Sequence, residues 1–360
     1  MSRGKTQCQF IANYVLKALS ESPEVSQHAR ESAARTLEID TRIRIERPAI
    51  QEAQPRHDGF ADPRFRESQQ YVAPTARPSM TSIYDCKETS SLPGTLVRDQ
   101  DERVKDRVVN NSYDGLQIAL SFFDGVFARK SLDDASLPLI GSVHYRPDYN
   151  NAFWDGRQMV FGDGDGESFD YFADSLDVIV HELTHGVTQY TANLQYEGQS
   201  GALNESISDV FACMAEQWYF GQTATEADWA LGQNLLPVAR KGIALRSLKK
   251  PGSAYNDKKL GKDPQVGHMR DYIKTWDDNG GVHMNSGIPN HAFYLTATGI
   301  AGKSWEQAGQ IWYRTLTDHR LRPTCTFKEF ADLTVENSEN IDGKPTTEIV
   351  KKAWESVGVL

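Results

Sequence analysis

The chain has 360 residues, of which 39% are hydrophobic and 24% charged, and this globular composition excludes a wholly disordered or fibrous protein. Its length favours two domains. The formal net charge of −10 argues against a nucleic-acid-binding protein, and no apolar run approaches the roughly 18 residues of a membrane helix.

The first 80 residues differ in composition from the rest. They carry 12 basic and 10 acidic residues, whereas the other 280 carry 27 and 39. Phe10, Tyr14 and residues 16–19 recur at helical spacing and predict a short amphipathic helix. Polar residues interrupt this apolar pattern, so it does not form the core of a secretory signal peptide. From Arg44 to Met80, five prolines predict an extended linker.

The remaining chain begins with strands and ends with helices. A helix is predicted over 116–130, and strand-like runs follow at 140–145 and 158–161. Further helices are predicted at 176–190, 204–220, 288–299, 305–319, 327–337 and 347–357. Early strands and late helices indicate an α+β domain joined to a helical one. The four cysteines form no CxxC pair, which excludes a cysteine-based zinc ribbon and leaves disulfides open.

Two histidines on the helix predicted at 176–190 have the spacing of metal ligands. His181 and His185 are four residues apart, so only about 40° separates them around the helix axis. Glu182 lies roughly 100° from His181, beside such a metal rather than on it, where it can take a proton from metal-bound water. Asp174 or Ser175 can cap the helix.

A carboxylate on the next predicted helix can complete the site. Glu205 follows His185 by 20 residues, which allows the chain to turn through 198–201 and return. Two histidines and one carboxylate leave a fourth position for water, as in catalytic rather than structural zinc sites. Asp209 and Asn204 are candidates to bond the distal nitrogens of these histidines. The alternative for Asp209 is an ordinary solvated carboxylate.

These motifs resemble those of the thermolysin-like neutral metalloproteases. The resemblance covers roughly residues 81–360 and rests on HELTH at 181–185, NESISD at 204–209 and further segments at 149–154, 162–166, 245–247 and 278–287. The N-terminal part is similar to the short prosegments of the protealysin-type branch, which carry a Cys followed by a Pro-Pro-Tyr-hydrophobic motif. Cys8 and Tyr14 match this motif, whereas Ala12-Asn13 replace the two prolines. The resemblance implies an α+β two-domain fold with the active-site cleft between the domains. The chain would then consist of a prosegment (1–78), an N-terminal α/β catalytic domain with a sheet (79–196) and a mainly helical C-terminal domain (197–360).

The resemblance also implies a role for each matching residue. Zinc would be held by His181, His185 and Glu205, with Glu182 as general base. His283 and Tyr196 would stabilise the oxyanion, and Asp278 would orient His283. The substrate backbone would be held by Asn151, Ala152 and Arg246. Phe169, Val178 and Leu245 match an apolar pocket, which implies cleavage before bulky hydrophobic residues. The resemblance also implies calcium as a ligand, with Asp177, Glu216 and Asp228 as candidates to bind it. Other carboxylates that are usual in the family's double calcium site are replaced in this chain. We therefore expect this double site to be weakened or lost.

The sequence thus predicts a zinc endopeptidase that acts on proteins or peptides and is made as a latent precursor inhibited by its own prosegment. Activation is expected to follow a self-cleavage between about Tyr71 and Ser82; the alternative is an N-terminal tail without inhibitory role. Two rival classes are a catalytically dead binding protein and a structural zinc protein. The presence of Glu182, Tyr196 and His283 disfavours the first, and the open fourth position disfavours the second. We expect a monomer with no nucleic-acid or membrane partner, exported without a recognisable signal peptide, with an intracellular location as the alternative.

Overall fold

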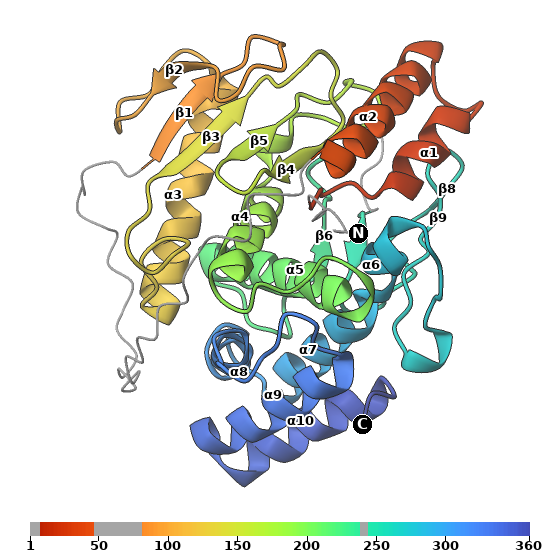
Figure 1. Cartoon of the computed structure of the whole chain (residues 1–360). Coiled ribbons are helices and arrows are strands. Elements are labelled where there is room, and N and C mark those ends of the chain that lie inside the picture. Colours follow the sequence, from red (N-terminus) through yellow and green to blue (C-terminus); the bar gives the residue numbers. More distant parts are fainter. Residues whose placement is uncertain (1–7, 47–80, 238–243) are drawn as a thin grey trace.

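The computed structural model describes residues 8–46, 81–237 and 244–360 (Figure 1). Its N-terminal unit, residues 8–46, contains two helices, α1 (Asn13–Glu21) and α2 (Gln27–Glu46). The amphipathic helix is confirmed in α1, which buries Val15, Leu16 and Leu19. The placement of Phe10 on this helix is wrong, because α1 begins only at Asn13, after the N-cap residue Ala12.

The predicted linker differs from the structure at its start. Residues 44–46 belong to the last turn of α2 rather than to an extended segment, and the second helix was not predicted. Residues 47–80, which hold the rest of the predicted linker and most of the expected cleavage region, lie outside the described residues.

A mixed five-stranded sheet follows, with the strand order β2-β1-β3-β5-β4. The strands are β1 (Thr81–Asp85), β2 (Thr95–Arg98), β3 (Leu139–Val143), β4 (Ala152–Trp154) and β5 (Met159–Phe161). Strands β1, β3 and β5 run parallel, whereas β2 and β4 are antiparallel edges. Both predicted strand runs are confirmed, but β3 ends at Val143 because His144 has a positive φ of 53°. Because β4 is the last strand of the sheet, one of its edges is open to another chain segment.

Helices α3 (Arg107–Phe127) and α4 (Leu176–Tyr190) pack on this sheet. α3 begins nine residues before the predicted start, because the Asp106 carboxylate accepts hydrogen bonds from the N–H groups of Val108 and Val109 and caps the helix. Gly141 on β3 allows α3 to approach the sheet closely, since a Cβ at Gly141 would lie 3.2 Å from a methyl carbon of Leu116 on α3. α4 has the predicted bounds. Ser175 is its N-cap residue, but its hydroxyl bonds Asp177 instead of capping the backbone.

The second half of the chain is mainly helical. Its helices are α5 (Gly198–Phe220), α6 (Asp278–Asn285), α7 (Gly287–Ile300), α8 (Gln307–Leu316), α9 (Phe327–Asp342) and α10 (Lys344–Ser356). The short pairs β6 (Ala230–Leu231) with β7 (Arg246–Ser247) and β8 (Asn256–Asp257) with β9 (Gly261–Lys262) lie between α5 and α6. This arrangement confirms the α+β class. Within the described ranges, no helix combines the length and apolar character of a membrane span.

Two local predictions for this half were wrong. Residues 198–201 were expected to form a turn, but they are the first turn of α5. Helix α6 was not predicted, because Asn279, Gly280 and Gly281 interrupt its first turn with positive φ angles of 52°, 85° and 75°.

α4 and α5 pack against each other below the sheet, and α5 also contacts α6. Figure 1 shows the α1–α2 pair beside the β4 end of the sheet. Buried residues of α1 belong to the same continuous apolar core as those of α4 and α5. The N-terminal unit is therefore packed into the molecule at the point where the sheet and the helical half meet.

Candidate active site

His181 and His185 project from α4 towards one point. Both side chains are buried, and their Nε2 atoms lie 3.1 Å apart. Their Nδ1 atoms face away from each other: that of His185 lies 2.8 Å from Oδ1 of Asn204, and that of His181 lies 2.9 Å from Oδ1 of Asp209. Each of these oxygens favours a proton on the Nδ1 that it faces, and in that tautomer each Nε2 presents its lone pair to the shared point.

Glu205 on α5 faces the two imidazoles. Its two carboxylate oxygens each lie 3.4 Å from one Nε2, Oε2 from that of His181 and Oε1 from that of His185. The side chain is fully buried, and Oε2 has no hydrogen-bond partner. Burial alone would raise the pKa of Glu205, but the neighbouring histidines lower it well below its usual value.

This donor set fits a zinc ion. Two lone pairs 3.1 Å apart repel each other unless a cation lies between them, and ligands at about 2.0–2.1 Å in tetrahedral geometry are separated by roughly 3.3 Å. The buried Oε2 of Glu205 supplies the compensating negative charge. His181, His185 and Glu205 would therefore hold the ion, as their sequence spacing predicts.

Glu182 lies beside this point and is held by the edge strand. The N–H of Trp154 on β4 donates to its Oε2 at 2.8 Å, while Oε1 is buried without a hydrogen-bond partner. Burial raises the pKa of Glu182 to about 8, although His181 acts in the opposite direction. The group can therefore take up and return a proton near neutral pH.

Tyr196 and His283 both contact Glu205. The Tyr196 hydroxyl donates to Oε1 of Glu205 and lies 3.4 Å from Nε2 of His283. Asp278 accepts from the His283 backbone N–H at 2.9 Å and lies 2.7 Å from its Nδ1. Burial alone would lower the pKa of His283, but Asp278 and Glu205 raise it. Helix α6, which was not predicted from the sequence, thus carries both Asp278 and His283.

Asp209 is not solvated. It is fully buried, and both its carboxylate oxygens accept from Nε of Arg246 at 3.0 Å. Asn290 on α7 donates to Oδ2 of Asp209 at 2.9 Å. The hydroxyl of Ser208 lies 3.1 Å from Nδ1 of His185. Neither Asn290 nor Ser208 was predicted to take part in the site. Burial alone would raise the pKa of Asp209, but Arg246 and His181 lower it. Asp209 therefore links the histidine to the arginine.

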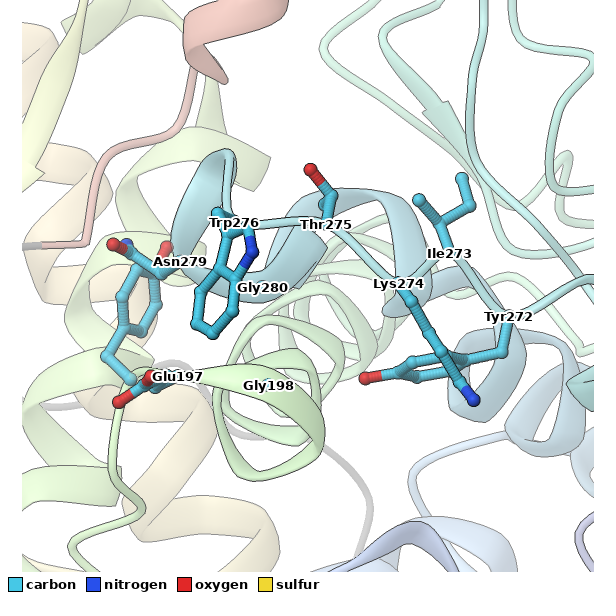
Figure 2. A pocket seen from close by; sticks show the side chains of 10 residues that line it. Glu197, Gly198, Tyr272, Ile273, Lys274, Thr275, Trp276, Asn279 and Gly280 are labelled. Atoms are coloured by element: carbon cyan, nitrogen blue, oxygen red, sulfur yellow. The ribbon is translucent and has the colours of Figure 1, made fainter.

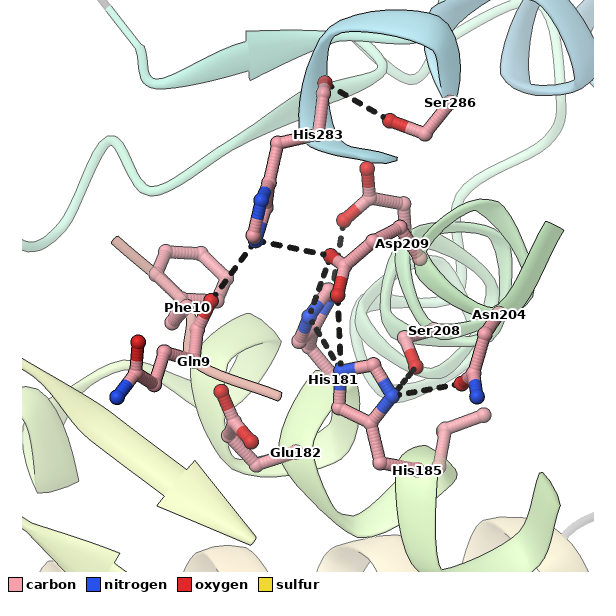
Figure 3. Close-up of polar contacts among 12 residues, drawn as sticks. Gln9, Phe10, His181, Glu182, His185, Asn204, Ser208, Asp209, His283 and Ser286 are labelled. Atoms are coloured by element: carbon pink, nitrogen blue, oxygen red, sulfur yellow. Dashed lines mark hydrogen bonds and ion pairs between the residues drawn. The ribbon is translucent and has the colours of Figure 1, made fainter. Parts of the chain in front are cut away.

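Residues 9–11 of the N-terminal unit lie across this site (Figure 3). The carbonyl oxygen of Gln9 lies 3.0 Å from Nε2 of His283, and Arg246 donates to the carbonyl of Phe10 at 3.0 Å. The Phe10 N–H donates to the carbonyl of Ala152 on β4 at 3.2 Å. The segment thus bonds the backbone of β4 without forming a strand of its own.

Asn151 holds the next residue through two bonds. The N–H of Ile11 donates to Oδ1 of Asn151 at 2.8 Å, and Nδ2 of Asn151 donates to the carbonyl of Ile11 at 3.0 Å. Asp40 on α2 supports this arrangement, because it accepts from Asn151 at 2.8 Å and from the hydroxyl of Tyr149 at 2.5 Å. The residues expected to bind a substrate backbone therefore bind the chain's own N-terminal segment.

The Phe10 side chain is completely buried at the centre of the site. Its ring meets that of His181 edge-on, with centroids 5.1 Å apart, and the Arg246 guanidinium lies 4.4 Å from its centroid. The three residues predicted to line an apolar pocket, Phe169, Val178 and Leu245, are buried in the same apolar core as Phe10.

The calcium candidates lie apart from this site. Burial, followed by the charges of Asp177 and Asp228, raises the pKa of Glu216 to about 9. Nε2 of Gln233 donates to Asp228 at 2.7 Å, and the N–H of Gly232 donates to Asp177 at 2.6 Å. Protein donors therefore already occupy oxygens of Asp177 and Asp228 that a calcium ion would need.

A pocket opens next to Tyr196, between the start of α5 and the loop before α6 (Figure 2). It is lined by residues 196–198, 272–276 and 279–280. Trp276 is 93% exposed at its rim. Because Tyr196 contacts the candidate ligand Glu205, this pocket borders the site.

Comparisons with known proteins agree with this geometry. Residues 64–189 match the family model for the thermolysin metallopeptidase catalytic domain, and residues 192–359 match that for its alpha-helical domain. An extracellular metalloprotease of Pectobacterium carotovorum subsp. carotovorum is 50% identical over 279 residues, which cover 77% of this chain and 80% of that protein. Thermolysin of Alicyclobacillus acidocaldarius subsp. acidocaldarius is 36% identical over 301 residues, 80% of this chain and 53% of that protein.

A solved structure extends the likeness to the N-terminal unit. The precursor of protealysin, a metalloproteinase from Serratia proteamaculans, aligns with 98% of this chain and 100% of its own, with a TM-score of 0.84 and 42% identity.

Proposed function

Since the chain belongs to the thermolysin family of metallopeptidases and is a zinc metalloendopeptidase, we propose that it is made as a latent precursor and cuts peptides before bulky hydrophobic residues. The observation that carries this proposal is the path of residues 9–11. Their backbone engages Ala152, Asn151 and Arg246, the residues expected to hold a substrate.

The roles of the site residues follow from their contacts. Zinc, when bound, supplies Lewis-acid polarisation of the scissile carbonyl and lowers the pKa of a water molecule. Glu182, held by Trp154, accepts the proton of the attacking water and passes it to the leaving amine. His283, oriented by Asp278, and Tyr196 donate to the oxyanion.

The preference for hydrophobic residues is supported by the position of Phe10. The Gln9 carbonyl lies where His283 would meet the scissile carbonyl of a substrate. Phe10 therefore stands at the position of the substrate residue that follows the scissile bond. Its side chain is fully buried in the core that contains Phe169, Val178 and Leu245. A bulky apolar side chain at this position of a substrate gains the same burial, whereas a small or charged one does not.

Latency is supported by the same contacts. Residues 9–11 occupy the backbone positions of a substrate, and α1 and α2 fix them through Asp40 and the apolar core. We assign residues 1–78 to this prosegment, 79–196 to the N-terminal catalytic domain and 197–360 to the helical one. Calcium is expected to bind weakly or not at all, because Gln233 bonds Asp228 and the Gly232 N–H bonds Asp177 at the candidate site.

A peptidase assay tests the proposal. The trimmed enzyme should cleave casein, lose this activity with a zinc chelator, and cut model peptides with Leu or Phe after the scissile bond faster than those with Ala. Glu182→Gln should retain one zinc per chain yet lose about 10²–10⁴-fold in turnover, since the side chain is not a ligand. Near-normal turnover of this variant would rule out Glu182 as the base.

A further inference from the structure

We propose that Cys8 is the fourth ligand of the zinc ion in the uncut chain. This inference rests on the proposed function, because it needs both a bound zinc and a prosegment in the cleft. Cys8 immediately precedes Gln9, whose carbonyl lies 3.0 Å from Nε2 of His283. Cys8 matches the cysteine of the protealysin-type prosegments, but its sequence position alone did not connect it with the metal.

The geometry places the thiol at the metal site. The Sγ of Cys8 and one ligand atom each of His185 and Glu205 lie within 4.8 Å of one another. One ion bound to three ligands at zinc–nitrogen, zinc–oxygen and zinc–sulfur distances of about 2.0–2.3 Å needs atoms no farther apart than this. Cys8 is therefore in reach of the ion that the other two would hold.

A second, independent observation points to a cation at this place. The lone pairs of two imidazoles face each other across 3.1 Å, and Oε2 of Glu205 is buried without a hydrogen-bond partner. His181, His185 and Glu205 leave one tetrahedral position open, and zinc accepts thiolate sulfur readily. Binding of Cys8 at that position releases the thiol proton to solvent and displaces one water molecule.

This ligation explains how the precursor survives. The bond between Gln9 and Phe10 lies in the register of a substrate, because His283, Ala152 and Arg246 contact it as they would a scissile peptide. Hydrolysis also needs a water molecule at the fourth position of the metal. With the Cys8 thiolate there, the attacking water is missing and the bond stays intact.

Cobalt spectroscopy tests the ligation without any measurement of activity. The full chain with Glu182→Gln, which cannot process itself, is loaded with Co²⁺ in place of zinc. We expect a near-ultraviolet sulfur-to-cobalt charge-transfer band that is lost in the Cys8→Ser/Glu182→Gln chain. The band should persist with Cys325→Ser, since Cys325 is buried in the loop before α9 and belongs to none of the elements of the site.

The outcomes separate the two proposals. If the visible bands of tetrahedral cobalt form but the charge-transfer band is absent, Cys8 is not a ligand and the zinc site itself stands. If cobalt does not bind at all, both proposals fail.

Thiol labelling gives a second readout on the zinc-loaded chain. Cys86, Cys213 and Cys325 are each at most 3% exposed, whereas Cys8 is more accessible. A thiol reagent should label about one cysteine per chain after chelation and label it much more slowly with zinc bound. Equal labelling rates with and without zinc would overturn the proposal.

Discussion

Asn151 and Ile11 exchange two hydrogen bonds, one in which the Ile11 N–H donates to Oδ1 and one in which Nδ2 donates to the Ile11 carbonyl. The side-chain amide thereby replaces a β-strand partner and recognises the backbone rather than a particular side chain. This explains why Ala12 and Asn13 are compatible with a docked segment where related prosegments have two prolines: the main contacts precede these positions.

Loss of the Phe10 ring should weaken latency. Phe10→Ala removes a fully buried ring that packs on His181, and such changes cost about 3–5 kcal/mol. The uncut variant should therefore hydrolyse small peptides and become trimmed faster than the parent chain. Lys17→Ala, an exposed position on α1, is the matched control and should behave like the parent. A Phe10→Ala chain as inactive as the control would contradict the anchoring role.

Removal of Glu205 should empty the metal site. Glu205→Ala leaves two imidazoles, so the purified chain should contain much less than one zinc. Its thermal unfolding midpoint should also fall, because a ligand at 100 times its Kd contributes about 2.7 kcal/mol to stability. Metal analysis and calorimetry on the same preparation check both effects. A variant that keeps one zinc per chain would show that another residue completes the site.

Asp278 should act through His283. Asp278→Asn weakens the hydrogen bonds to Nδ1 and to the backbone N–H of His283, so His283 becomes less well oriented and its pKa falls. We expect kcat to drop by up to about 10²-fold, the value of one oxyanion donor, with little change in KM. Asp277→Asn changes an exposed neighbour and serves as the control. A purely structural role would instead lower stability while kcat of the folded fraction stayed normal.

His144 should make stability depend on pH. The Nδ1–H of His144 donates to the Asp163 carboxylate at 2.7 Å, and this bond raises the pKa of His144 to about 9 despite partial burial. Because this value exceeds the roughly 6.5 of the unfolded chain, the stabilisation is fully present below about pH 6.5 and is lost as pH rises through about 9. Denaturant titrations of the Glu182→Gln chain should show that His144→Gln destabilises it at pH 6 and much less at pH 10. His319→Gln, at a 70% exposed side chain, should have little effect at either pH.

The convergence of His181 and His185 could be predicted from sequence because its information is local. The spacing of His181 and His185 on one helix fixes their common direction, and α4 has the predicted bounds. The family expected from these motifs is confirmed. The α+β class also followed from the order of strands and helices.

The rest depended on contacts between residues distant in sequence. Helix α6 escaped prediction because glycines with positive φ interrupt it, so His283 could be linked to the site only by resemblance. Phe10 continued the apolar periodicity of α1, but its N–H bonds Ala152 on β4 and its carbonyl bonds Arg246, so the helix begins only after it. Nothing in the local pattern of Ser208 or Asn290 distinguishes them from ordinary helical residues.

The account is tested most directly by following activity and cleavage in the same samples. The full chain is incubated and, at intervals, the initial rate of peptide hydrolysis and the fraction of trimmed chain are measured, with N-terminal sequencing of the product. We predict that the rate is proportional to the trimmed fraction, extrapolates to zero for the uncut chain, and accompanies a new N-terminus between Tyr71 and Ser82. The Glu182→Gln chain should remain uncut throughout. A rate that is already maximal before any trimming would contradict the account.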